Sequence, residues 1–459
     1  EARVGQGWGM LMECLAEGRS ISLPALSTGG AKLAARHTGA YARVRRQFKL
    51  PIGRFEGVQE ALARIAGQTY IMEAARMLTA AAVDRGERPS VISALVKREL
   101  TERMRSVIND AMDVVGGAGI CMGSRNPLGR IYKAIPIGIT VEGANILTRS
   151  MIVFGQGAIR AHPYLLKEMN GISNPDPEEG LRHFDRALFA HIRFTISNVI
   201  RTFWLGISAA RFQVVPLGLS DARYFRSLTR MSAAFALCAD LTLAILGGGL
   251  KRKEFLSGRF ADVLSHLYMG SALLKQFYDH GRPKEDLPLL DWGMRYSLYQ
   301  SQQALLEILQ NFPIRWLGSF LKVWIFPYGA PHQAPNDRLT QAAAETILSP
   351  SETRDRLTQG IYLPVDHGDP MALLEEALKL VVTAEGPEKK LKNALSQGVI
   401  HGPVGGPFWD ETLLQHAVDK NVISGNEANV VRRSDQARSN AILVDSFDKP
   451  DADNEREAT

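Results

Sequence analysis

The stretch FDRALFAHIRFTISNVIRTF, residues 184–203, decides the fold class. Its apolar residues recur three and four positions apart, which is the spacing of one face of an α-helix. They are Phe184, Leu188, Ile192, Ile196, Val199 and Phe203. Long segments with the same spacing fill most of the chain, whereas the alternation typical of strands is nearly absent. The sequence therefore predicts an all-α protein with helices of bundle length.

The same periodicity places further helices and the loops between them. Helices are predicted over 33–48, 55–82, 90–115, 222–246, 254–278 and 289–309. The segments NGISNPDPEEG (170–180) and FPYGAPHQAPND (326–337) are rich in proline and polar residues, so each predicts a break. We expect a first domain over 1–165, a helical second domain over 166–435 and a disordered tail over 436–459, where little can be buried.

Composition describes an ordinary globular protein of 459 residues, with 45% hydrophobic and 22% charged residues. The three cysteines are far apart and odd in number, so they form neither a disulfide framework nor a zinc ligand set. This favours a reducing compartment. The ten histidines show no ligand spacing, and no metal site is predicted.

Charge is distributed unevenly along the chain. Residues 1–165 hold 22 Lys and Arg against 13 Asp and Glu, a net +9, whereas the whole chain is +6. A basic domain suits a nucleotide cofactor, a coenzyme A ester or nucleic acid, and an ordinary solvated surface fits equally well. The apolar segment Met231–Leu250 is nearly long enough to span a bilayer. Asp240 at its centre would cost about 2.5–3.5 kcal/mol there, so a buried core helix is favoured.

The stretch ITVEGANILTR, residues 139–149, places the single carboxylate of Glu142 in an apolar run. Glu142 could cap the helix that follows it, through the helix dipole. Alternatively, it could be a general base in a dry pocket, where burial raises a carboxylate's pKa towards neutrality. Gly143 would let the chain approach a ligand closely. The residues alone leave both interpretations open.

Four stretches in the first 165 residues form an ordered set. They are LAEGRSIS, YARVRRQFKLPIGRFEGVQEALARIA, DVVGGAGI and VEGANILTR. In this order and separation they resemble the C-terminal domain of acyl-CoA dehydrogenases, and the long continuation resembles the large bacterial FadE type of fatty-acid β-oxidation. The resemblance implies a C-terminal four-helix bundle followed by a helical extension. It also implies that this chain is the C-terminal part of a larger enzyme.

The resemblance further implies a FAD-dependent enzyme that forms the α,β double bond of medium- or long-chain fatty acyl-CoA. Glu142 would abstract the α-proton, flavin N5 would take the hydride, and electron-transfer flavoprotein would take the electrons. The family motifs place residues against FAD and the substrate as follows. Arg45, Gln47, Phe48, Asp113, Gly116, Gly117 and Asn145 would contact FAD, and Arg19 and Gly143 the substrate. Five positions depart from the family pattern: Lys49 replaces a glycine, Glu56 and Asp113 each replace a glutamine, and Val141 and Ala144 replace an aromatic residue and a threonine.

For partners and location, the resemblance implies a homodimer or higher oligomer in the cytoplasm, without nucleic acid. We also expect peripheral contact with the inner membrane, through the basic segment Lys251–Lys253 beside the apolar helix 254–278, and through Trp324, Phe326 and Tyr328. The alternative for these aromatic residues is burial in the core. The alternative for the whole chain is a non-catalytic helical scaffold, or a membrane-docking subunit that keeps only the bundle.

Overall fold

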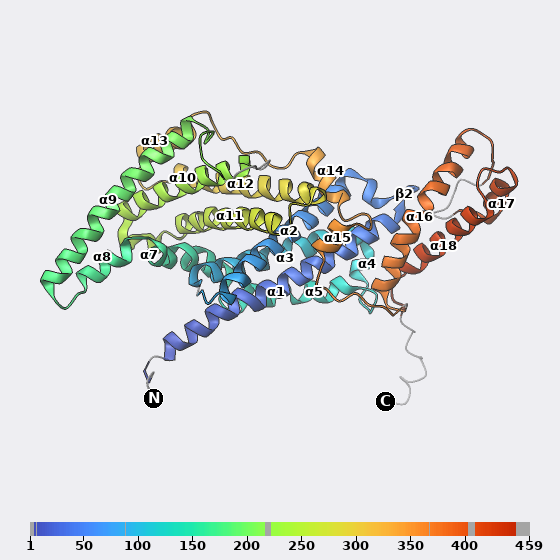
Figure 1. Cartoon of the computed structure of the whole chain (residues 1–459). Helices are drawn as coiled ribbons and strands as arrows, with labels where there is room; N and C mark the ends of the chain where they lie inside the picture. The colour runs from blue at the N-terminus through green and yellow to red at the C-terminus, as the bar shows by residue number, and fades with distance from the viewer. Residues whose placement is uncertain are drawn as a thin grey trace. The chain divides into compact units, whose positions relative to one another are not determined.

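The computed structural model describes residues 4–5, 7–87, 89–215, 222–366, 368–402 and 409–446, with a few side chains inside the helices left out. Figure 1 shows a chain built almost wholly of helices. Its contacts divide it into two compact units. Unit 1 comprises residues 1–28, 67–104 and 135–340, and unit 2 comprises residues 29–66, 105–134 and 341–459.

The first part of the chain forms four long helices, and all four contribute residues to both units. They are α1 (Gly7–Val44), α2 (Glu56–Asp84), α3 (Ser90–Val115) and α5 (Pro127–Thr140), with the short α4 (Gly117–Ile120) between the last two. Of these, α2, α3 and the second half of α1 were predicted. The predicted boundaries of α3 are reproduced. One short antiparallel hairpin, β1 (Arg46–Gln47) with β2 (Leu50–Pro51) and the 3-10 turn η1 (Ile52–Arg54), separates α1 from α2. The periodicity gave no signal for that hairpin.

Unit 1 continues through a second layer of helices. These are α6 (Asn145–Leu147), the π-helix η2 (Thr148–Gln156), α7 (Gly157–Ala161), α8 (Leu165–Ile172), α9 (Pro177–Ile207), α10 (Ala222–Leu246), η3 (Gly247–Arg252), α11 (Glu254–Asp279), η4 (Lys284–Asp286), α12 (Leu287–Gln310) and α13 (Arg315–Ile325). Helix α11 packs against α12 and η2, and α10 packs against α9, α11 and α12. The core of this unit therefore lies around α10, α11 and α12.

Unit 2 is completed by the C-terminal helices α14 (Asp337–Glu345, shared with unit 1), α15 (Glu352–Leu357), α16 (Pro370–Ser396), α17 (Glu411–Asp419) and α18 (Gly425–Ala441). Helices α16, α17 and α18 enclose a small apolar core that includes Leu391, Leu414 and Val431. The start predicted for the disordered tail, residue 436, is wrong, because α18 continues to Ala441 and buries Arg438. Residues 447–459 lie outside the described residues.

Local sequence explains where the helices begin. At the predicted break 170–180, Asp176 accepts hydrogen bonds from the amides of Glu178 and Glu179, with Pro177 as the first residue of α9. Ser424 and Glu427 form a reciprocal capping box at the start of α18. The predicted break at 326–337 separates α13 from α14.

Helix α10 with η3, residues Ala222–Arg252, is long and apolar enough to cross a membrane. However, 44% of its most apolar window is buried inside the protein. Asp240 is buried at its centre and accepts hydrogen bonds from three neighbouring side chains. These contacts are those of a core helix, as the sequence predicted.

Part of the apolar face predicted for α9 is exposed. Ile192, Ile196 and Ile200 are exposed, as are Phe189 and Trp204. Because α9 carries apolar residues on two faces, periodicity correctly predicts the helix but cannot tell which face packs inside. The face that packs on α10 includes Asn198, Thr202 and Leu205.

The expected membrane-docking segments are corrected in part: the basic segment Lys251–Lys253 is exposed, but most of its expected apolar partners are not. Most apolar residues of α11 belong to the core, and Phe326 is buried. Trp324 packs on Phe203 and donates a hydrogen bond to the carbonyl of Val199. Of the three aromatic residues in that expectation, Tyr328 alone is exposed.

Candidate active site

The turn that follows α5 carries Glu142. Glu142 has φ 54° and Gly143 has φ 101°, so two consecutive residues adopt left-handed backbone. Glycine adopts this conformation readily, but for a glutamate it costs about 1–3 kcal/mol. Such strain persists only where surrounding contacts impose it, so this turn must be held in place.

Arg19, from α1, lies against this turn. A Cβ added to Gly143 would stand 3.2 Å from Arg19 Nη2, and one added to Gly18 would stand 3.7 Å from Glu142 Oε1. Glu142 Oε2 is buried and accepts no hydrogen bond from the described residues, and Arg19 Nε is buried and unbonded on the same basis. The predicted base and the predicted substrate residues Arg19 and Gly143 therefore meet at one turn.

Lys97, a residue not foreseen from the sequence, holds the turn from α3. Its side chain is buried, and Nζ lies 2.8 Å from Gly143 O, 2.8 Å from Asn145 Oδ1 and 3.4 Å from Ile139 O. Burial, and next the charge of Arg19, lower the pKa of Lys97 to about 8, against the attraction of Glu142. A buried cation thus lies beside the candidate base.

The side chain of Asn145 is hydrogen-bonded inside the protein. Its side chain is buried, accepts from Lys97, and donates to Thr101 Oγ1 and Glu102 Oε1, both at 2.9 Å. Both amide hydrogens are therefore used inside the protein. The side-chain contact between Asn145 and the flavin stays a prediction, and among the described residues Asn145 ties the turn to α3.

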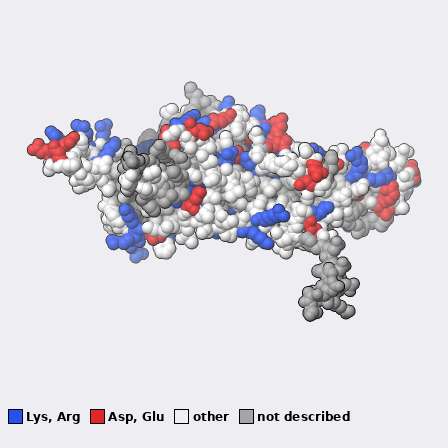
Figure 2. Space-filling model, turned by 90° about the horizontal axis from the view of Figure 1, so that it is seen from below, with Lys and Arg blue, Asp and Glu red and all other residues white. Residues whose placement is uncertain are grey.

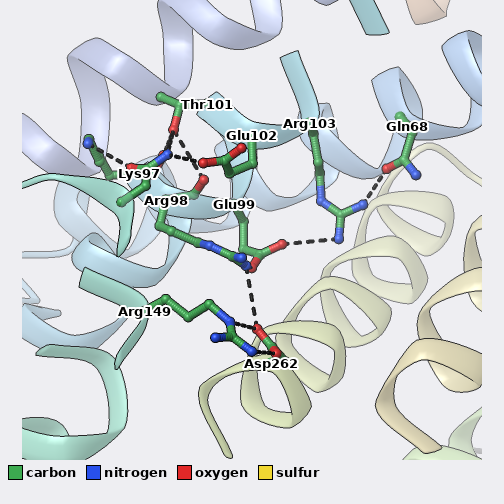
Figure 3. Close-up of polar contacts among 10 residues, drawn as sticks. Gln68, Lys97, Arg98, Glu99, Thr101, Glu102, Arg103, Arg149 and Asp262 are labelled. Carbon is green, nitrogen blue, oxygen red and sulfur yellow. Dashed lines mark hydrogen bonds and ion pairs between the residues drawn. The ribbon is translucent and has the colours of Figure 1, made fainter. Parts of the chain in front are cut away.

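Other charges of α3 anchor the segment that follows the turn (Figure 3). Glu99 is buried and pairs with Arg98 and Arg103. Burial would raise the pKa of Glu99, but Arg98 and then Arg103 lower it to about 2. Asp262 of α11 accepts a hydrogen bond from Arg149 Nε at 2.8 Å, and its carboxylate lies 3.6 Å from the guanidinium of Arg98. Ion pairs thus join α3, η2 and α11.

The segment after the turn, η2, is π-helical, which is rare and frequently found at functional sites. Ser150, inside it, donates to Glu254 Oε2 at 2.8 Å, and Ser257 donates to the Ser150 carbonyl. These contacts fix η2 on the first turns of α11.

The predicted flavin residues of the hairpin lie in unit 2. Phe48 is 88% exposed and Gln47 is also exposed. The two loop residues, Phe48 and Lys49, have φ 50° and 66°, the conformation of a type I′ hairpin turn. Lys49 therefore keeps the left-handed backbone that the family's glycine would adopt, at a steric cost.

The two consecutive arginines of this hairpin differ in their partners. Arg46 is paired with Glu388 of α16, which also lies 3.5 Å from Arg438. The guanidinium of Arg45 is half-buried and makes no hydrogen bond or ion pair with any described residue. Arg45 therefore keeps its donors available for a ligand.

The predicted adenosine-contacting residues also lie in unit 2. Gly116, with φ 59° and ψ −132°, is the N-cap of α4, and a Cβ on Gly116 or Gly117 would meet no atom within 4 Å. Asp113, one helical turn earlier on α3, is exposed. The backbone here is open to a ligand, as a glycine cradle requires. The hairpin and glycine residues belong to unit 2, whereas the Glu142 turn belongs to unit 1.

One group of side chains has metal-ligand chemistry, contrary to the absence of a histidine pattern in the sequence. Ligand atoms of His162, His191 and Asp240 lie within 4.8 Å of one another. However, His162 Nδ1 accepts from two backbone amides at the start of α8, so Nε2 carries the proton that it donates to Asp240 at 2.9 Å. His191 Nδ1 lies 2.8 Å from Glu168. These hydrogen bonds favour a polar tie between α8, α9 and α10 over a metal centre.

A sequence signal for Lys97 did exist. On a helical projection Lys97 shares one face with Thr101, Met104 and Ile108, and Met104 and Ile108 are typical core residues. A lysine at the end of an apolar face needs acceptors inside the protein. The partners of Lys97 lie more than 40 residues later, so they could not be identified from the pattern.

Two family models match this chain. Residues 5–155 match the acyl-CoA dehydrogenase C-terminal domain, and residues 159–447 match the bacterial-type acyl-CoA dehydrogenase C-terminal region. The second match alone covers more than half of the chain.

Curated relatives agree with this assignment. A probable acyl-CoA dehydrogenase, FadE10 of Mycobacterium tuberculosis, is 27% identical over 68% of this chain and 48% of its own length. The mouse mitochondrial very long-chain specific acyl-CoA dehydrogenase is 26% identical over 58% of this chain and 38% of its own length. The chain spans about half the length of the FadE10 relatives that it matches.

Among solved structures, an acyl-CoA dehydrogenase from Bacillus anthracis complexed with FAD superposes with a TM-score of 0.57. It is 19% identical, and the match covers 75% of this chain and 57% of that chain. This similarity supports the fold. Together with the two family models, it shows that the chain belongs to the acyl-CoA dehydrogenase family.

Proposed function

We propose that this chain carries the catalytic base of a FAD-dependent enzyme that introduces the α,β double bond into medium- or long-chain fatty acyl-CoA. The observation that carries the proposal is the Glu142 carboxylate, held in left-handed backbone with one buried oxygen that accepts no hydrogen bond from described residues. An ionised carboxylate is an acceptor only, so an unused buried oxygen is ready to take a proton.

The chemistry assigns one step to each group. Glu142 takes the proton from the carbon next to the thioester carbonyl, and the electron pair of that C–H bond forms the new double bond. FAD, which enzymes of this family use, supplies the acceptor for the hydride that leaves the β-carbon. Arg19 and Lys97 balance the charge of Glu142 before the proton arrives. We propose that Arg19 and Gly143 contact the substrate, and the absence of a side chain on Gly143 lets Arg19 lie close to the turn.

For flavin binding, we propose Arg45 for the pyrophosphate, Gln47 and Phe48 for adjoining contacts, and Asp113, Gly116 and Gly117 for the adenosine end. The free guanidinium of Arg45 supports its role, because a guanidinium forms paired hydrogen bonds with phosphate. The exposed, left-handed Phe48 supports a docked hairpin. Arg45→Ala should weaken FAD binding by about 10- to 150-fold. Equal FAD retention in Arg45→Ala and in the exposed control Arg54→Ala would contradict this contact.

We propose electron-transfer flavoprotein as the electron acceptor and medium- or long-chain acyl groups as the substrate class. Family membership supports an assembly of at least two copies. We also propose a domain division near residue 165, with the helical extension beyond it. The junction of the two matched family regions, at 155–159, supports that division.

We further propose cytoplasmic localisation with peripheral contact at the inner membrane, now assigned to the outer face of α9. Its exposed apolar residues follow helical spacing over four turns, and Trp316, Phe320 and Val323 of α13, which packs on α9, are exposed too. Arg193 and Arg201 adjoin this apolar row. An apolar face flanked by arginines suits an anionic lipid surface. Figure 2 shows basic and acidic side chains gathered at the projecting end of the α8–α9 hairpin.

A non-catalytic scaffold is the alternative to an enzyme, and the two differ in whether they bind FAD and turn over acyl-CoA. A scaffold that keeps only the bundle requires no FAD and no acyl-CoA turnover. The buried Oε2 of Glu142, which accepts no hydrogen bond from the described residues, favours the enzyme, because most buried structural carboxylates are hydrogen-bonded or ion-paired.

The test is Glu142→Gln in the intact FAD-loaded protein. This change keeps the shape of the side chain and removes its basicity, so turnover of fatty acyl-CoA should fall by about 10²–10⁴-fold while FAD content stays stoichiometric. Glu168→Gln, a glutamate outside the turn, serves as the control and should turn over as the parent does. Turnover of Glu142→Gln close to that of the parent, or a parent that binds no FAD, would refute the proposal.

A further inference from the structure

Lys97 is bonded as an ammonium group. Its three acceptors, Ile139 O, Gly143 O and Asn145 Oδ1, match the three N–H donors of a protonated lysine. A neutral amine has only two donors and would lose one of these contacts. All three acceptors belong to the segment that carries Glu142. The protonated form of Lys97 therefore holds that segment more completely than the neutral form.

Two further side chains of α3, Thr101 and Glu102, also hold the segment that carries Glu142. Asn145, which accepts from Lys97, also donates to Thr101 Oγ1 and Glu102 Oε1. Lys97 and Thr101 lie one turn apart on α3, so α3 contacts both the start and the end of the turn. Because Glu142 is strained at φ 54°, loss of this support would let it relax to ordinary backbone.

The charges that face Lys97 come from three elements. Arg19 of α1 repels it, whereas Glu142 of the turn and Glu102 of α3 attract it. Burial and the repulsion from Arg19 lower the pKa of Lys97 to about 8, so the proton can leave within the range in which enzymes are assayed. The three hydrogen-bond acceptors around Lys97 Nζ, and not its pKa, identify the protonated side chain as the form that fits this site.

We propose that Lys97 is the positioning residue of the active site: its ammonium holds the Glu142 turn, and the site reaches its full rate only while that ammonium is protonated. This inference rests on the proposed role of Glu142 and adds a regulation of the same site by pH. Raising the pH above about 8 in the parent protein should have the same effect as removing the Lys97 side-chain charge.

The first experiment needs neither flavin nor substrate. Hydrogen exchange of the amides of Val141 and Thr148, which bond to Ile137 O and Ala144 O, reports the order of the turn. In Lys97→Met, protection of these amides should fall about 10-fold or more, whereas Lys275→Met, an exposed lysine of α11, should leave it unchanged. In the parent, protection corrected for intrinsic exchange should fall between pH 7 and pH 9.5. Unchanged protection in either arm overturns the inference, and the pH arm decides even if the variant does not fold.

The second experiment joins the turn to catalysis in the intact FAD-loaded protein. For Lys97→Met, kcat should fall about 10- to 100-fold with little change in KM, and the parent's decline of kcat above pH 8 should be absent. A merely structural role would lower kcat equally at every pH and keep that decline, which would refute the regulation. If exchange responds as expected but Glu142→Gln turns over normally, the proposed function fails while the role of Lys97 in holding the turn stands.

Discussion

The Glu142 turn and the outer face of α9 depart from the usual distribution of residues in opposite ways. Around the turn, charged side chains are buried: Lys97 and Glu99 are almost inaccessible. On α9, large apolar side chains are exposed, with Phe189 at 68% and Ile200 at 63%. Both regions belong to unit 1, so the same compact unit contains both exceptions.

The difference separates two kinds of function. Buried charges require specific partners, and here they hold a strained backbone that presents one unpaired carboxylate oxygen. Exposed apolar residues require no internal partner, and they are available to another surface. Changes at the turn should therefore alter stability and catalysis, whereas changes on α9 should alter docking alone.

The largest effect on stability is expected from Asn145→Leu. This change removes one buried hydrogen bond each from Lys97, Thr101 and Glu102, and should lower the free energy of unfolding by about 2–4 kcal/mol. Chemical denaturation measures it. The matched change Asn311→Leu, at an exposed position after α12, should cost much less. Equal losses in the two variants would show that the turn is not specially anchored.

A smaller effect should appear on acidification. Burial, and then the charge of Arg103, lower the pKa of His266 to about 3 from 6.5. The unfolded chain therefore takes up this proton first, so the stability contribution of neutral His266 is present above pH 6.5 and is lost as the pH falls towards 3. At pH 4.5, His266→Phe should be less destabilised by acid than the parent by about 1–3 kcal/mol.

The control for that measurement is His183→Gln, an exposed histidine of α9, which should follow the parent curve. Identical acid sensitivity of parent and His266→Phe would contradict the assignment of a neutral buried histidine. This pair also contrasts the two regions directly, since one histidine lies inside unit 1 and the other on the exposed helix.

The smallest effect on stability is expected on α9. Ile196→Glu with Ile200→Glu should change the free energy of unfolding by no more than about 0.5 kcal/mol, because both side chains are exposed. The same variant should lose co-sedimentation with anionic vesicles at low salt. Ser271→Glu with Gln310→Glu adds the same charge elsewhere and should retain binding. Vesicle binding that survives the α9 change, or a parent that does not bind, would refute the docking face.

Much of the fold could be predicted from local sequence. The boundaries of α3 and α10 follow from apolar periodicity, and α9 begins where Asp176 and Pro177 supply a cap. The π-helix η2 could not be foreseen, because its geometry is tied to contacts of Arg149 and Ser150 with distant residues of α11. The exposure of Ile196 could not be foreseen either, since hydropathy does not reveal which of two apolar faces finds a partner.

The residues of the candidate site could also be predicted only in part. Glu142 stood out as a lone carboxylate in an apolar run, and family resemblance placed Arg19 near it. The role of Lys97 could not be predicted, because its acceptors are two backbone carbonyls and an amide oxygen, which no sequence pattern identifies. The hydrogen bonds of Asn145 with Thr101 and Glu102 could not be predicted either, because these partners lie more than 40 residues away in the sequence.

The most direct test of the account is the rate of flavin reduction in a single anaerobic turnover of the intact FAD-loaded protein with fatty acyl-CoA. The substrate should carry either protium or deuterium at the carbon next to the thioester. The account predicts rapid reduction and a deuterium isotope effect in the parent. In Glu142→Gln it predicts reduction slower by about 10²–10⁴-fold, with acyl-CoA still bound. Reduction of the flavin by Glu142→Gln at the parent rate would contradict the assignment of Glu142 as the base.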